Sequence, residues 1–198
     1  WAFGCKGRGA LHQHLTASPG KVIARKLAQR FLGSEYYPGE RLQRSIDWSS
    51  LYGDPNDVNL FRRWLHHILN DAGRKDLPEG FSTSQLREFA GLMTYRLCRI
   101  YIQFEQWPKC HASVSSHAEL SDFYDRHQVL DAVIRMENMS EGLADVLQCV
   151  GTQVTIEALE AEVRTNASSH CPWKEYYDEA LLALVKERDA LIFDRFDY

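Results

Sequence analysis

The first chemistry that the sequence suggests is the binding of an anion near the N-terminal end. Lys6, Arg8 and Lys21 lie in a glycine-rich stretch, and His12 and His14 stand between them. Lysine and arginine side chains bind phosphate-like groups, and a histidine can accept a proton at neutral pH. Lys and Arg outnumber Asp and Glu in the first quarter of the chain. This quarter can therefore face an anionic ligand, although a solvated basic surface explains the same pattern.

A second polar group stands near the C-terminal end. Asn166-Ala-Ser168 is followed by His170 and then by Lys174. An amide, a hydroxyl and an ammonium group can bind an anion together, and the histidine is a candidate base. The same Asn and Ser side chains can instead cap a turn. We leave both interpretations open at this point.

Several other motifs resemble nucleotide-binding or metal-binding sites but lack the residues that such sites need. Gly4 and Gly9 have the spacing of a phosphate-binding loop, but Ala10-Leu11 replaces its Lys-Ser/Thr pair, which excludes an ATP or GTP site. His66-His67 lies on a predicted helix, where neighbours point about 100° apart, so a shared metal site is not expected. The five cysteines contain no C-x-x-C pair, which argues against zinc and leaves one disulfide open. An aromatic loop with Trp48 can stack on a sugar or pack in the core.

Length and charge bound the class of protein. The 198 residues have a formal net charge of −4 and a hydrophobic content of 44%, which is ordinary for a single globular domain over 1–198. The charge gives no sign of a nucleic-acid partner, and no apolar run reaches membrane-spanning length. The chain opens on "WAFG" without a Met, so we expect a domain that is truncated at its N-terminus.

Apolar periodicity then predicts the elements that must position these side chains. Helices are expected at 20–33, 54–73, 86–104, 117–127, 140–151 and from about residue 178. Asp54, Ser82 and Ser140 are the expected caps, and Trp107-Pro108 is expected to end the third helix.

One segment has the composition of a strand. Residues 129–136 are rich in Val, Ile, Ala and Met, and a helix is expected directly after them. A largely apolar strand followed by a helix is typical of a parallel sheet. The sequence therefore predicts an α/β fold rather than a helical bundle.

Two C-terminal stretches carry a resemblance. "VLDAVIRMENMSEGLADVLQCVG" and "NASSHCPWKEYYDEALLALVKERDALIFDRFDY" resemble, in order and spacing, the end of the carbohydrate-type sulfotransferases. The match covers roughly the last seventy residues, with Asp197 in place of the usual Gly. The residues that follow the pattern are Asn166, Ser168, Tyr176, Tyr177, Leu184, Val185, Asp194, Phe196 and Tyr198.

The resemblance implies a P-loop-like three-layer fold with a parallel sheet. It implies transfer of sulfate from 3′-phosphoadenosine 5′-phosphosulfate to a carbohydrate hydroxyl. It also implies that the terminal aromatic residues pack on the body of the fold, and that Glu137 ties a strand to a helix rather than serving as a base.

The donor-binding motifs of that family match the front of the chain only in part. In one register Pro19, Lys21, Val22 and Ile23 follow the 3′-phosphate element, but Ala17 and Arg25 replace its Arg and Ser, and the other element would lie upstream. In the alternative register Gly4 to Pro19 is an altered 5′-phosphosulfate loop. We favour the first register. The donor-binding apparatus is incomplete in both.

These observations give three hypotheses. The first is a sulfotransferase in which Lys6, Arg8, Lys21, Asn166 and Ser168 contact the donor. Each missing charged contact is expected to weaken donor binding by about 1.5–3 kcal/mol, so activity of this chain is doubtful. The second is a non-catalytic, sulfotransferase-derived domain that binds a carbohydrate or a protein. The third is an unrelated helical α/β domain. No catalytic base is identified.

Overall fold

The chain is helical wherever its structure is described. The structure is a computed structural model that describes residues 10–18, 20–23, 46–54, 56–161 and 171–197. Across these ranges no β-strand forms, and one antiparallel bridge between Ile102 and Gln128 is the whole of the β pairing. The predicted α/β fold with a parallel sheet, and with it the three-layer P-loop-like architecture, is therefore wrong.

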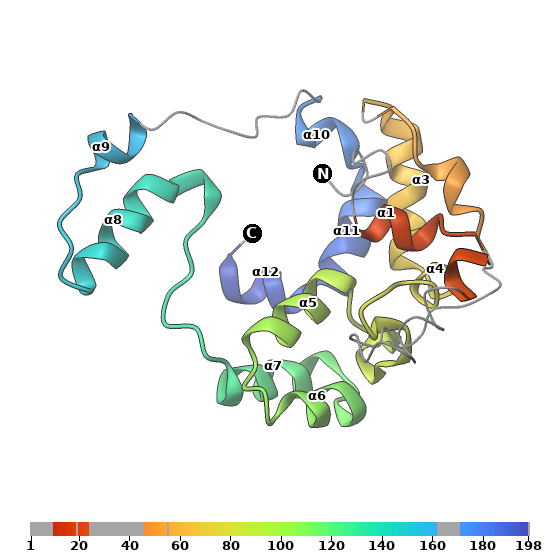
Figure 1. The fold of residues 1–198 in the computed structure, drawn as a ribbon, viewed down its shortest axis with the longest axis horizontal. Coiled ribbons are helices and arrows are strands. Elements are labelled where there is room, and N and C mark those ends of the chain that lie inside the picture. Colours follow the sequence, from red (N-terminus) through yellow and green to blue (C-terminus); the bar gives the residue numbers. More distant parts are fainter. Residues whose placement is uncertain (1–9, 19, 24–45, 55, 162–170, 198) are drawn as a thin grey trace. The chain divides into compact units, whose positions relative to one another are not determined.

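The described helices fall into two units (Figure 1). One unit comprises residues 1–128 with 170–198, and the other comprises residues 129–169. The first unit contains α1 (Ala10–Leu15), η1 (Trp48–Leu51), α3 (Val58–Leu69), α4 (Asp71–Arg74), η2 (Phe81–Thr83), η3 (Gln85–Glu88), α5 (Leu92–Tyr101), α6 (Trp107–Ser113), α7 (His117–His127), α10 (Trp173–Tyr176), α11 (Glu179–Arg188) and α12 (Ala190–Phe196). The second contains η4 (Met136–Asn138), α8 (Met139–Cys149) and α9 (Ile156–Glu160).

The segment predicted as a buried strand is an irregular stretch of chain. Residues 129–135 have no regular structure, and the side chains of Val129 and Val133 are 54% and 51% exposed. A parallel strand needs neighbouring strands for its backbone and burial on both faces. The described chain offers this segment neither, so its apolar composition does not produce a strand.

The second unit buries little of itself. α8 and α9 contain no buried residue, and Met136, Met139 and Val150 are at least half exposed. α8 begins at Met139, after Asn138, so Ser140 lies inside the helix rather than capping it. The predicted end at Gly151 is confirmed, because this residue follows the helix with a φ of 80°.

The helix predicted at 54–73 is real but shorter. Asp57, not Asp54, caps α3, because its carboxylate accepts a hydrogen bond from the backbone N–H of Leu60 at 2.9 Å. α3 ends at Asn70, whose backbone is extended. The Asn70 side chain then caps α4 by accepting from the N–H of Gly73 at 2.9 Å. Asn70 thus ends α3 through its extended backbone and caps α4 through its side-chain amide.

The long central helix predicted at 86–104 is divided. Ser84 rather than Ser82 caps a 3-10 turn, and α5 does not begin until Leu92. Trp107-Pro108 opens α6 instead of ending its predecessor. Proline is favoured in the first turn of a helix, where its missing N–H has no partner to lose. The predicted helix at 117–127 is confirmed, as is the start of the terminal helix after Asp178.

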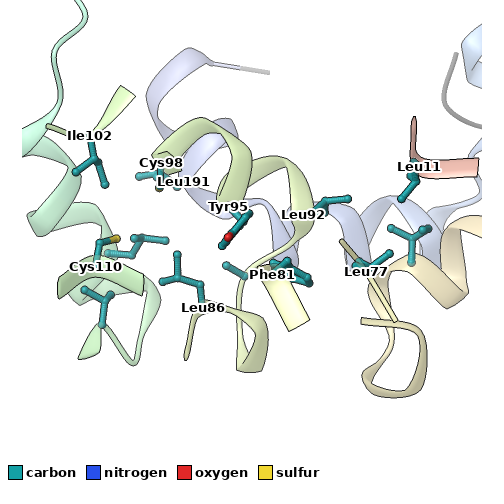
Figure 2. Packing of buried hydrophobic residues seen from close by; sticks show 14 of the residues in the cluster. Leu11, Leu77, Phe81, Leu86, Leu92, Tyr95, Cys98, Ile102, Cys110 and Leu191 are labelled. Carbon is teal, nitrogen blue, oxygen red and sulfur yellow. The ribbon is translucent and has the colours of Figure 1, made fainter. Parts of the chain in front are cut away.

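The core of the first unit runs beneath α5 (Figure 2). Leu77, Phe81 and Leu86 are completely buried, and the rings of Phe81 and Tyr95 meet edge to face at 5.2 Å. Tyr95 donates its hydroxyl to the backbone carbonyl of Glu79 at 2.6 Å. Apolar burial and satisfied polar groups therefore hold the 3-10 turns against this helix.

The C-terminal helices pack on the same body. The buried Asp189, between α11 and α12, accepts a hydrogen bond from the backbone N–H of Thr94 at 2.8 Å. Burial raises the pKa of this carboxyl. Leu191 is 3% exposed and belongs to the core, and Phe196 is half-buried. Tyr198 lies outside the described residues.

The described cysteines are free thiols: Cys98, Cys110, Cys149 and Cys171. A hydrogen bond with Cys110, together with burial, raises the pKa of Cys98, which keeps that thiol protonated and unreactive. No helix in the part of the chain that the structure describes is long and apolar enough to cross a membrane.

A test of the fold is the substitution Gly73→Ala. A Cβ here would overlap the backbone carbonyl oxygen of His67 and lie 3.2 Å from Trp48 Cη2. We expect the free energy of unfolding to fall by roughly 1–3 kcal/mol, in spite of alanine's higher helix propensity. Urea denaturation measures the change.

Gly20→Ala is the matched control, because a Cβ at Gly20 meets nothing within 4 Å. It should change the free energy of unfolding by less than about 0.5 kcal/mol. Equal unfolding midpoints for the two variants would show that the close approach of α4 to α3 is wrong.

Candidate functional site

A cleft of about 460 Å³ lies between α3 and the start of α11. Its α3 side is basic and its α11 side is mainly apolar. The lining residues are Arg62, Arg63, His66 and His67 on α3, with Asp178, Ala180, Leu181 and Leu184 at α11. We call this the α3–α11 cleft.

The helical period puts the four basic side chains on one side of α3. Positions 62 and 66, like positions 63 and 67, are four residues apart and therefore stack along the helix surface. Trp64 and Ile68 are buried on the core side of the same helix. Burial of that apolar stripe fixes the rotation of α3, which leaves the basic side chains to line the cleft.

Arg62 joins the two walls. Its Nε donates to the carbonyl oxygen of Tyr176 and its Nη2 to that of Glu175, both at 3.0 Å. Its Nε also lies 3.6 Å from the Asp178 carboxylate, an ion pair with partly exposed partners. Such an ion pair contributes little energy, but three acceptors in fixed positions orient the guanidinium.

Aromatic packing supports the same junction. The ring of Phe61 meets the rings of Tyr176 and Tyr177 edge to face, at 4.9 Å and 5.6 Å. Trp64 lies 5.9 Å from Phe61 on the other side. The two tyrosines belong to the C-terminal pattern described above, and their role here is to dock α10 on α3.

Asp178 is the cap of α11. Its carboxylate accepts the backbone N–H of Leu181 at 2.9 Å while it faces Arg62. This leaves Arg63 as the one cation in the described lining of the cleft without a carboxylate partner. Arg63 is exposed, and Ala180 and Leu184 line the same cleft.

Asn70 sets the protonation of the two histidines. Its Oδ1 accepts from Gly73, so its Nδ2 is the group that faces Nδ1 of His66 at 3.5 Å and Nδ1 of His67 at 3.3 Å. An amide nitrogen can only donate, so each Nδ1 must accept. In this arrangement Nδ1 of each ring is the acceptor, and Nε2 is left to donate.

The surroundings of His67 favour this neutral form. Burial lowers the pKa of His67, and the nearby His66 and Arg63 lower it further. A neutral imidazole can bind a metal ion through Nδ1, but here each Nδ1 faces the Asn70 amide nitrogen. Within the described ranges no group of three or more His, Cys, Asp or Glu side chains is placed to hold a metal ion.

Of the predicted donor-binding residues, the structure describes Lys21, which does not line this cleft. Lys6, Arg8, Asn166 and Ser168 lie outside the described residues, as does the candidate base His170. Lys21 is exposed on a helical stretch at 20–23.

Two other candidates are explained by packing. His14 is 6% exposed, and its Nε2 lies 3.1 Å from the carbonyl oxygen of Asp76. Trp48 is 1% exposed and donates to the Asp76 carboxylate at 2.9 Å, so it has no free face for a sugar. Lys174 stands 5.7 Å over the ring of Trp173, and Glu137 is exposed in η4.

Sequence reasoning missed this site. His66-His67 was weighed only as a metal pair, and Arg62 and Arg63 were not singled out. The available signal was four basic side chains on one side of a well-formed amphipathic helix. The sequence did not show that α10 and α11, more than a hundred residues away, would close that side into a cleft.

The comparisons with known proteins add no relative. No protein-family model matches the chain, and neither a curated protein nor a solved structure is significantly similar to it.

The lowered pKa of His67 makes the stability of the fold depend on pH. A histidine whose folded-state pKa is lowered binds fewer protons than in the unfolded chain, so folding is disfavoured as the pH falls below the unfolded value of about 6.5. We expect the free energy of unfolding to decrease from pH 7 to pH 5. Urea denaturation at each pH measures it, and NMR titration of the His67 ring follows the group itself.

His67→Gln is the informative variant, because a glutamine oxygen can still accept from Asn70 but does not titrate. This variant should lose part of the decrease between pH 7 and pH 5. An unchanged slope would show that His67 does not contribute to it.

Proposed function

We propose that this chain is a binding domain whose α3–α11 cleft takes a small anionic ligand. The observation that carries the proposal is Arg63, a cation that lines the cleft with no ion-pair partner among the described residues. An arginine beside an apolar wall, in a concave site of this size, has the chemistry of an anion-binding pocket.

The neighbouring side chains add donors to this charge. His66 and His67 each keep an Nε2–H, because Asn70 occupies their Nδ1 atoms. Donors that are neutral and already oriented can bind an oxyanion without first taking up a proton. Ala180 lies in the first turn of α11, where the helix dipole also favours negative charge.

The same contacts argue for binding rather than catalysis in the cleft. A general base needs an unoccupied acceptor within reach of the substrate. Asp178 is engaged with Leu181 and Arg62, and the acceptor nitrogens of both histidines face Asn70. Each acceptor side chain in the described lining therefore already has a donor group beside it.

Sulfate transfer from 3′-phosphoadenosine 5′-phosphosulfate to a carbohydrate hydroxyl is a second candidate function. It is favoured by the ordered pattern over the last seventy or so residues, which includes the Tyr176-Tyr177 pair. In that case Lys21 would contact the donor, and the α3–α11 cleft would be a separate site.

The test is calorimetric titration at pH 8 with phenyl sulfate, an oxyanion on a small apolar body. We expect saturable binding that weakens about tenfold or more in Arg63→Gln, because a hydrogen bond to a charged group contributes about 1.5–3 kcal/mol. Arg126→Gln is the control. It makes the same charge change on α7, at an exposed arginine paired with Asp122.

Three outcomes separate the candidates. Loss of affinity in Arg63→Gln alone supports the cleft, and equal loss in both variants indicates non-specific attraction. Saturable binding of adenosine 3′,5′-bisphosphate that depends on Lys21 and not on Arg63 would support the transferase instead. A folded protein that binds neither compound would overturn both candidates.

A further inference from the structure

The lining of the α3–α11 cleft also indicates which class of anion it takes. We infer that its ligand is an organic monoanion: a single carboxylate, sulfonate or sulfate group on an apolar body. This inference rests on the proposed function, and it specifies the charge and shape of the ligand.

The first argument is the balance of charge. Arg62 faces Asp178 at 3.6 Å, so these two charges offset one another. Both histidines are held neutral through Asn70. One positive charge, on Arg63, therefore remains in the described lining. A monoanion is neutralised by it, whereas a dianion would keep a surplus negative charge close to the Asp178 carboxylate.

The second argument is the position of Asp178. Its carboxylate is held beside the cleft, because it caps α11 through Leu181 and faces Arg62. The fixed negative charge thus stands on the wall that a bound anion approaches. Like charges in a partly enclosed site repel, and the repulsion grows with the charge of the ligand.

The third argument is the apolar part of the α11 wall, beyond Asp178. Ala180, Leu181 and Leu184 offer no side-chain donor or acceptor, and Ala180 and Leu184 are the ones that solvent reaches. A polar body such as a free inorganic ion would leave this wall in contact with water. An apolar body covers it, and each buried CH₂-sized group adds to the affinity.

A matched series of ligands tests the charge. Phenyl sulfate is a monoanion at pH 8, and phenyl phosphate has nearly the same shape but is a dianion, since its second pKa is about 6. We expect phenyl sulfate to bind about tenfold more tightly. Phenylacetate carries a carboxylate in place of the sulfate. It should bind as tightly as phenyl sulfate if the cleft accepts any singly charged oxyanion. Methyl sulfate should bind at least tenfold more weakly, because it lacks the apolar body.

A variant on the apolar wall tests whether the ligand binds in the cleft. Ala180→Asp adds a carboxylate to the cleft in the first turn of α11, where an acidic residue suits the helix. We expect it to abolish phenyl sulfate binding while leaving the thermal midpoint unchanged or higher. Ala183→Asp is the control, because Ala183 is exposed on the same helix and does not line the cleft.

The outcomes distinguish this inference from the proposed function. If phenyl phosphate binds more tightly than phenyl sulfate and its binding still depends on Arg63, the ligand is not a monoanion. The cleft would then remain an anion-binding site. Equal binding of methyl and phenyl sulfates would overturn the apolar body. An equal loss of affinity for phenyl sulfate in Ala180→Asp and Ala183→Asp would show that the ligand binds outside the cleft. If no compound binds the folded protein, both proposals are wrong.

Discussion

The site depends on the contact of the Arg62 guanidinium with the chain segment just before α11. Arg62 reaches the carbonyl oxygens of Glu175 and Tyr176, more than a hundred residues later in the chain. Without this contact α3 would present a row of basic side chains on an open surface. With it, α10 and the start of α11 stand beside α3, and the surface becomes a cleft. Two adjacent arginines thereby take different roles, because Arg62 is used in the fold and Arg63 is not.

Local signals in the sequence predicted the helices whose ends are set by neighbouring residues. α7 spans the predicted residues 117–127, with Ser116 accepting from the N–H of Glu119. α11 starts after Asp178 as expected. Both caps lie within three residues of the groups they bind, so a single chain segment contains all the information needed. The same holds for the end of α8 at Gly151.

The sequence-based predictions were wrong where the local structure depends on segments that are distant in the chain. The composition of residues 129–136 suits a strand, but a strand exists only with partners, and the described residues supply none. Asp54 instead accepts from the N–H of Asn56, and the cap of α3 is Asp57. The resemblance to sulfotransferases implied a parallel sheet, and the described residues form none. The cleft itself needed Arg62, Phe61 and the two tyrosines to meet across the chain.

Asn70 connects the chemistry of the cleft to the stability of the fold. Its amide oxygen caps α4, and its amide nitrogen holds the acceptor nitrogens of His66 and His67. Protonating either ring would place an N–H against this nitrogen and disturb the cap. The two histidines are therefore kept as neutral donors by the same group that turns the chain between α3 and α4. The cleft consequently relies on one fixed charge, that of Arg63, because the other basic groups in it are committed to the structure.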